Sequence, residues 1–160
     1  LIALGHTRIV HFGGPEGSTQ AGERVDGLRR ACGAARVPFT DDDVIPAGAH
    51  LEDGYRAARA YFAGPAAEGA ARPTAVTCFN DLVALGVCRA LAERGLRVPG
   101  DVSVVGYDDI PLLEYLPVPL TTVRVPTVEL GRLAAELLLR HVDGGPGVAT
   151  QKIYLDAELV

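Results

Sequence analysis

The stretch Val102–Asp109, with the sequence VSVVGYDD, joins an apolar run to a glycine, a tyrosine and two adjacent carboxylates. The apolar run predicts a buried β-strand. An isolated ionised carboxylate is costly in an apolar interior, so Asp108 and Asp109 predict that the chain emerges there into a polar cleft. The end of this strand is therefore the first candidate position for a functional site.

The rest of the chain alternates short apolar runs with amphipathic stretches of helical spacing. Apolar strands separated by helices are typical of a parallel sheet that helices cover on both faces, and the predicted fold class is α/β. The strands are predicted in residues 7–14, 42–46, 74–79 and 102–107, and the helices in 18–37, 50–64 and 81–94. After Pro111, we predict a strand over 119–125, a helix from Pro126 and a closing strand over 151–160.

The composition is that of an ordinary globular protein. Of the 160 residues, 48% are hydrophobic and 22% are charged, and the formal net charge is -5. This balance excludes disorder, and it excludes nucleic acid as a direct partner of this segment because phosphate-binding surfaces are basic. No apolar run approaches the roughly 20 residues of a membrane span. Cys32, Cys78 and Cys88 lack metal-ligand spacing and indicate reduced packing cysteines in a cytoplasmic protein.

The opening residues suggest a piece of a longer protein. The chain contains no methionine, and its first residues, LIALGH (Leu1–His6), are typical of the last turn of a helix. We therefore expect further sequence before Leu1.

Polar side chains follow three of the predicted strands, at the edge where open parallel sheets bind ligands. A glycine turn after the first strand leads to the helix that carries Arg24; Asn80 and Asp81 follow the third strand, and Asp108 and Asp109 the fourth. Each also has a purely structural interpretation. Asn80 suits a helix N-cap, and Arg24 suits a solvated surface arginine. One aspartate of the adjacent pair suits a turn in which its carboxylate binds the backbone.

Together, Arg24, Asn80 and Asp108 offer a guanidinium fork, an amide and a carboxylate, which suit vicinal hydroxyls or the edge of a nucleobase. Signals for catalysis are missing, since the sequence has no phosphate-binding glycine loop and no nucleophile elbow. The histidines lie on separate predicted elements without metal-ligand spacing; they are His6, His11, His50 and His141. We predict no catalytic residue, no metal site and no cofactor. An enzyme that uses Asp108 and Asp109 is the weaker hypothesis, because neighbouring side chains on a strand point apart.

The string NDLVALGVCRALAERGLRVPGDVSVVGYDDIP, from Asn80 to Pro111, closely resembles the lactose and galactose repressor (LacI/GalR) family of bacterial transcription regulators. Further matching segments follow in the family's order: LIALGHTRIVHFGGPEGS near the start, then PLTTVRVP and ELGRLAAELLLRHVDG. The resemblance implies a two-lobed sensor of the periplasmic-binding-protein-like type I fold. Residues 1–118 would form its C-terminal lobe, 119–143 a crossover strand and helix of the N-terminal lobe, and 144–160 a return strand. The helix-turn-helix and most of the N-terminal lobe would be absent from this chain.

By position, the resemblance assigns the effector contacts to Arg24, Asn80 and Asp108, with Asp109 and Asp81 as structural partners. It places four further residues next to the ligand: Ser18, Ala49, His50 and Tyr107. The family often carries, at the position of Ala49, an aromatic residue that stacks on a sugar or base. This departure leaves the effector class open between a sugar, which is the first expectation, and a purine.

The resemblance also implies partners and a mechanism. A small-molecule effector between the lobes would shift the population of lobe arrangements, and so change the spacing of two DNA-binding heads in a homodimer. Operator DNA would bind through the absent domain, and no membrane contact is expected. The main alternative is a periplasmic-type sugar-binding protein of the same fold. The glycine and proline punctuation in LRVPGDVSVVGYDDIP (Leu96–Pro111) favours the regulator.

Overall fold

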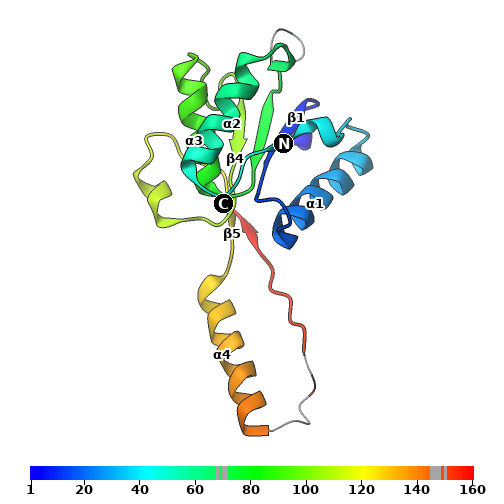
Figure 1. Ribbon diagram of the computed structural model, residues 1–160, viewed down its shortest axis with the longest axis vertical. Coiled ribbons are helices and arrows are strands. Elements are labelled where there is room, and N and C mark those ends of the chain that lie inside the picture. Colours follow the sequence, from blue (N-terminus) through cyan, green and yellow to red (C-terminus); the bar gives the residue numbers. More distant parts are fainter. Residues whose placement is uncertain (68, 70–71, 145–148, 150) are drawn as a thin grey trace.

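A four-stranded parallel sheet lies at the centre of the fold (Figure 1). The computed structural model describes all residues except 68, 70–71, 145–148 and 150. The strands are β1 (Ile9–Gly13), β2 (Val44–Pro46), β3 (Ala75–Cys78) and β4 (Ser103–Val105). Their order is β2-β1-β3-β4, so the chain adds β2 on one side of β1, and β3 and β4 on the other. Such a reversal creates a crevice beyond the carboxyl ends of β1 and β3, where open α/β sheets bind ligands.

The register of β1 and β3 decides which side chains share a face of the sheet. His11 lies opposite Thr77, and Phe12 lies opposite Cys78. Because side chains alternate along a strand, Phe12 and Cys78 share one face, and His11 and Thr77 share the other. Phe12 and Cys78 belong to the main hydrophobic core.

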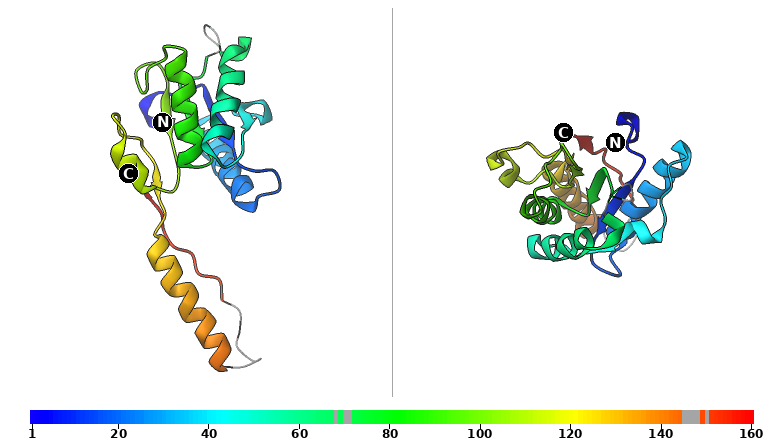
Figure 2. Two further views of the ribbon diagram at one scale, coloured as in Figure 1. Left: turned by 60° about the vertical axis from the view of Figure 1, so that its left-hand side comes forward. Right: turned by 90° about the horizontal axis from the view of Figure 1, so that it is seen from above.

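Helices cover both faces of the sheet, as the sequence predicts (Figures 1 and 2). α2 (Leu51–Ala63) and α3 (Asp81–Glu93) pack on the face of the main core, and α1 (Thr19–Ala35) lies on the opposite face. α2 and α3 approach each other closely at Gly86, where an added β-carbon would lie 2.1 Å from the carbonyl oxygen of Leu51. Only glycine permits this contact.

Short 3-10 helices precede and connect these elements. They are η1 (Ile2–Leu4), η2 (Asp41–Asp43), η3 (Pro65–Ala67) and η5 (Pro111–Tyr115). η1 occupies the opening residues, where the sequence predicts the last turn of a helix, and it ends at Gly5 in the left-handed conformation with φ of 91°. A left-handed glycine is a common helix stop.

The last part of the chain projects away from the sheet (Figures 1 and 2). β5 (Val123–Arg124) pairs antiparallel with β6 (Glu158–Leu159), and between them α4 (Thr127–Gly144) extends outward. α4 contains no buried residue, and its leucines Leu138 and Leu139 are 65% and 60% exposed. Within the part of the chain that the structure describes, no helix is both long and apolar enough to cross a membrane.

The predicted fold class and the predicted helices are confirmed, but the strands are shorter than expected, most of all the two after Pro111. The strand expected over 119–125 is reduced to β5, with parallel bridges from Thr121 to Val105 and from Arg124 to Asp108. The return strand expected in 144–160 is reduced to β6, because its only strand partner among the described residues is the two-residue β5. Residues 145–148 and 150 of that prediction lie outside the described residues.

Candidate ligand-binding site

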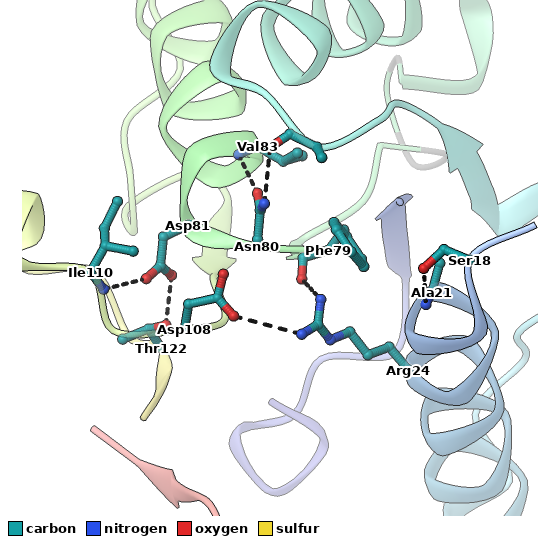
Figure 3. Close-up of polar contacts among 11 residues, drawn as sticks. Ser18, Ala21, Arg24, Phe79, Asn80, Asp81, Val83, Asp108, Ile110 and Thr122 are labelled. Atoms are coloured by element: carbon teal, nitrogen blue, oxygen red, sulfur yellow. Dashed lines mark hydrogen bonds and ion pairs between the residues drawn. The ribbon is translucent and has the colours of Figure 1, made fainter. Parts of the chain in front are cut away.

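Arg24 reaches from α1 across the carboxyl ends of the strands (Figure 3). The helix starts beside the crevice because Ser18 caps it, its hydroxyl accepting a hydrogen bond from the backbone N–H of Ala21 at 3.3 Å. The Arg24 guanidinium donates to the carbonyl oxygen of Phe79 and lies 3.7 Å from a carboxylate oxygen of Asp108. Its side chain is only 18% exposed. The interpretation of Arg24 as a solvated surface arginine is therefore wrong.

Two aromatic rings hold the Arg24 guanidinium. Its central carbon lies 3.8 Å from the ring centroid of Tyr107 and 4.4 Å from that of Phe79. Both distances fall within the range of cation–π attraction, which is worth about 0.5 to 2 kcal/mol per contact. These two rings therefore orient the Arg24 side chain.

The turn after β4 sends its two aspartates in different directions. Asp108 and Asp109 both have positive φ, of 115° and 59°, a region that residues other than glycine rarely adopt. The carboxylate of Asp109 accepts from Nε of Arg124 at 2.5 Å, whereas Asp108 faces Arg24. Burial raises the pKa of the Asp108 carboxyl; the Arg24 charge opposes this shift and Asp81 adds to it. Asp108 is therefore the carboxylate that remains available to a ligand.

The backbone of this turn is held by Asp81 and not by either of the adjacent aspartates. One oxygen of the buried Asp81 carboxylate accepts from the backbone N–H of Ile110 at 3.0 Å, and the other accepts from the Thr122 hydroxyl at 2.6 Å (Figure 3). The expectation that Asp108 or Asp109 binds the backbone is wrong for the residues that the structure describes. Asp81 does so instead, because it is buried at the start of α3, directly after Asn80.

Asn80 is a helix N-cap, as its structural interpretation predicts. Its side-chain oxygen accepts from the backbone N–H of Val83 at 2.9 Å and caps α3. Its amide nitrogen donates to the carbonyl oxygen of Ala49 at 2.9 Å and so joins α3 to the loop before α2. Asn80 also lines the cavity described next, so that the residue that connects these two elements lies at the edge of the site.

A cavity of about 850 Å³ lies between α1, the carboxyl ends of the strands and the chain around β5. Of the predicted site residues, Arg24, Asn80, Tyr107 and Asp108 line it. Further lining residues that the sequence reading did not select include His11, Gln20, Glu23, Thr77 and Phe79. His11 and Thr77 had a signal in the sequence, since each is a polar residue inside an apolar strand. Phe79 had none, because a large apolar residue at the end of a buried strand is also expected in the core.

Three residues predicted next to the ligand lie outside the lining of this cavity. Ser18 caps α1, and Ala49 contributes its carbonyl oxygen to Asn80. His50 is exposed at the start of α2, where its backbone N–H donates to Asp53 at 3.1 Å. Their assignment to the ligand remains a prediction from the resemblance.

Metal-ligating chemistry is not assembled in the part of the chain described. No group of three or more His, Cys, Asp or Glu side chains there is placed to hold a metal ion. All three cysteines are free thiols, and burial raises the pKa of Cys78 and Cys88, the latter to about 11. A thiol with a raised pKa is a poor nucleophile at neutral pH, as expected of packing cysteines.

The family model of the periplasmic-binding-protein-like domain matches residues 1–160. The chain belongs to this family. Curated relatives of the periplasmic-binding-protein-like chain include the HTH-type transcriptional repressor PurR of Vibrio atlanticus (strain LGP32), which is 38% identical over 142 residues. That match covers 89% of this chain and 41% of the relative. The ribose operon repressor of Escherichia coli (strain K12) is 37% identical over 155 residues, covering 97% of this chain and 45% of the relative.

Solved structures of LacI-family regulators share the fold of this periplasmic-binding-protein-like chain. The complex of the transcriptional regulator CelR with cellobiose superposes with a TM-score of 0.91 at 33% identity, covering 100% of this chain and 47% of that one. The lac repressor dimer bound to operator and the anti-inducer ONPF gives a TM-score of 0.85 at 31% identity, covering 100% and 53%. The resemblance to the LacI/GalR family is confirmed. The chain spans less than half the length of the curated relatives described above.

Proposed function

We propose that this chain is the effector-sensing C-terminal lobe of a LacI-type transcriptional regulator. The observation that carries the proposal is the facing pair of Arg24 and Asp108 at the mouth of the cavity, 3.7 Å apart and held by neighbouring groups. A guanidinium donates and a carboxylate accepts, so the pair suits adjacent hydroxyl groups of one small molecule. A ligand that lacks a matching group leaves these charges unpaired, which is the main source of discrimination.

Within this proposal, residues 1–118 are the lobe itself, 119–143 the crossover into an N-terminal lobe, and 144–160 the return. The exposed apolar side chains of α4 support this division, since a helix with no buried residue and several exposed leucines is unusual in a complete domain. The full-length regulator is a cytoplasmic homodimer that binds operator DNA through a domain outside this chain. The net charge of -5 agrees with DNA contacts lying elsewhere.

A sugar is the first candidate effector, and a purine is the second. Relatives and structures with names that refer to ribose and cellobiose favour the sugar. Relatives named PurR favour the purine. The relatives named in these comparisons are transcription regulators, which favours binding over catalysis by Asp108 and Asp109. Effector binding would shift the population of lobe arrangements and through them the DNA affinity.

The test is a thermal-shift panel of D-ribose, cellobiose and guanine on the full-length protein. We expect one of them to raise the Tm, because a ligand that binds only the folded state stabilises it. Arg24→Ala and Asp108→Ala should remove the shift. Arg30→Ala, an exposed arginine of the same helix, and Asp42→Ala, an exposed aspartate, are the matched controls and should keep it. Retention of the shift by both site variants would refute the site.

A further inference from the structure

The floor of the cavity holds a polar group that has no partner among the described residues. His11 is 1% exposed, and its Nε2 atom is buried without a hydrogen-bond partner. Its Nδ1 atom lies 3.0 Å from the hydroxyl of Thr77, the residue opposite it on β3. A buried nitrogen without a partner costs about 1 to 3 kcal/mol, so native proteins rarely keep one without a use for it.

The ring of His11 lies beside the site. His11 and Thr77 occupy the face of the sheet that α1 covers, and both line the cavity together with Arg24. A β-carbon on Gly13 would lie 3.9 Å from Cδ2 of His11. Cδ2 is bonded to Nε2, so this edge of the ring faces the carboxyl end of β1, where the crevice lies.

We propose that Nε2 of His11 is a further specificity-determining contact of the effector and receives one hydroxyl group of a sugar. The inference rests on the proposed function and adds to it a contact from a more deeply buried residue, since His11 is 1% exposed whereas the side chains of Arg24 and Asp108 are 18% and 41% exposed. Arg24 donates hydrogen bonds to hydroxyl groups of the sugar, and Asp108 accepts them. His11 selects for a sugar that carries one more hydroxyl group at the position where it reaches Nε2.

The electrostatics of the floor favour a hydroxyl over an ion. Burial, with a smaller effect from the Arg24 charge, lowers the pKa of His11 to about 4, so the imidazole is neutral near pH 7. In a neutral ring bonded to Thr77, Nε2 is either a donor or an acceptor, depending on the tautomer. A hydroxyl both donates and accepts, so it satisfies either tautomer. A phosphate or carboxylate of a ligand would gain no charge pairing there.

The test is a double-mutant cycle on the full-length protein with calorimetric titration. The probe is whichever of D-ribose and cellobiose raises the Tm, together with its single-deoxy analogues. The variants are His11→Leu, which removes the polar group, and His11→Gln, which keeps one. Ile9→Val, a buried neighbour on the same strand, is the control. We expect His11→Leu to weaken the Kd of the sugar about tenfold, as loss of one buried hydrogen bond would. Ile9→Val should leave it unchanged, and His11→Gln should fall between them.

The decisive result is whether removing one hydroxyl group from the sugar changes the Kd of the parent but not that of His11→Leu. One deoxy analogue should bind the parent about tenfold more weakly than the sugar does, yet bind His11→Leu as well as the sugar. If every analogue loses the same factor in parent and variant, Nε2 contacts an internal water only and the inference is overturned. Binding of guanine alone would overturn it too.

A measurement on the parent protein covers the case in which the variants do not fold. The ¹⁵N chemical shift of His11 Nε2 should change on saturation with the sugar and return to its ligand-free value with the decisive deoxy analogue. An unchanged shift overturns the inference. Failure of the whole panel, or unaltered binding by Arg24→Ala and Asp108→Ala, would instead overturn the proposed function and this inference with it.

Discussion

The buried carboxylate of Asp81 fixes the position of Asp108 without contacting the cavity. It ties the start of α3 to Ile110 after the turn and to Thr122 before β5. The fit is close, since a β-carbon on Gly106 would lie 2.1 Å from a carboxylate oxygen of Asp81. Asp108, which lines the cavity, is thus positioned by a residue 27 places earlier in the chain, through contacts that no local pattern in the sequence specifies.

We predict that Asp81→Ala destabilises the protein by roughly 3 kcal/mol, because it leaves the buried Thr122 hydroxyl and the part-buried Ile110 N–H without an acceptor. Urea unfolding measures the change in the free energy of unfolding. Asp42→Ala removes an exposed aspartate and should change it by less than about 0.5 kcal/mol. Equal effects of the two substitutions would show that Asp81 does not hold the turn.

His11 gives the stability a pH dependence of known sign. Its pKa is lowered from 6.5 to about 4 in the folded protein, so between these values the unfolded chain binds the proton more readily. The stabilisation is therefore complete above pH 6.5 and is lost as the pH falls toward 4. We predict that the parent loses on the order of 3 kcal/mol more than His11→Gln over this interval. Urea unfolding at pH 7, 6, 5 and 4 tests this, and parallel pH curves would contradict it.

At the scale of elements, glycine is required where α3 meets α2 and is only tolerated in α1. We predict that Gly86→Ala costs more than about 3 kcal/mol, since its β-carbon would overlap the backbone of Leu51 and the two helices would have to separate. Gly33→Ala is the matched substitution in α1, where nothing lies within 4 Å of the added carbon. It should stabilise the protein by about 0.5 to 1 kcal/mol through helix propensity. Chemical unfolding of both variants measures the difference, and changes of the same sign would contradict it.

The elements that can be predicted best from the sequence are those that their own apolar periodicity and capping residues specify. The strand predicted over 102–107, found as β4 (Ser103–Val105), and the helix capped by Asn80 follow from apolar periodicity and capping, and both lie where they are expected. The strand predicted at the end of the chain does not, because strand length depends on a partner, and β5 offers two residues. The cation–π contacts of Arg24 with Phe79 and Tyr107 could not be predicted either, since they join three segments that are distant in sequence.

At the scale of the whole molecule, α4 is the element whose substitutions should affect the free energy of unfolding differently in this chain and in the proposed two-lobed protein. Its side chains make no buried contacts here, and Leu138 is 65% exposed. In the two-lobed protein that we propose, the packing partners of this leucine lie in the other lobe. The same substitution should therefore have different consequences in the 160-residue chain and in the full-length protein.

We predict that Leu138→Glu changes the free energy of unfolding of the 160-residue chain by less than about 0.5 kcal/mol, because it alters a surface position. In the full-length protein it should cost about 2 to 5 kcal/mol, as removal of a core leucine does. Arg140→Gln, at an exposed position of the same helix, should be neutral in both. Unfolding both proteins in urea decides the matter. A cost that is equally small in the full-length protein would mean that α4 stays exposed there, and the assignment of residues 119–143 to a second lobe would fail.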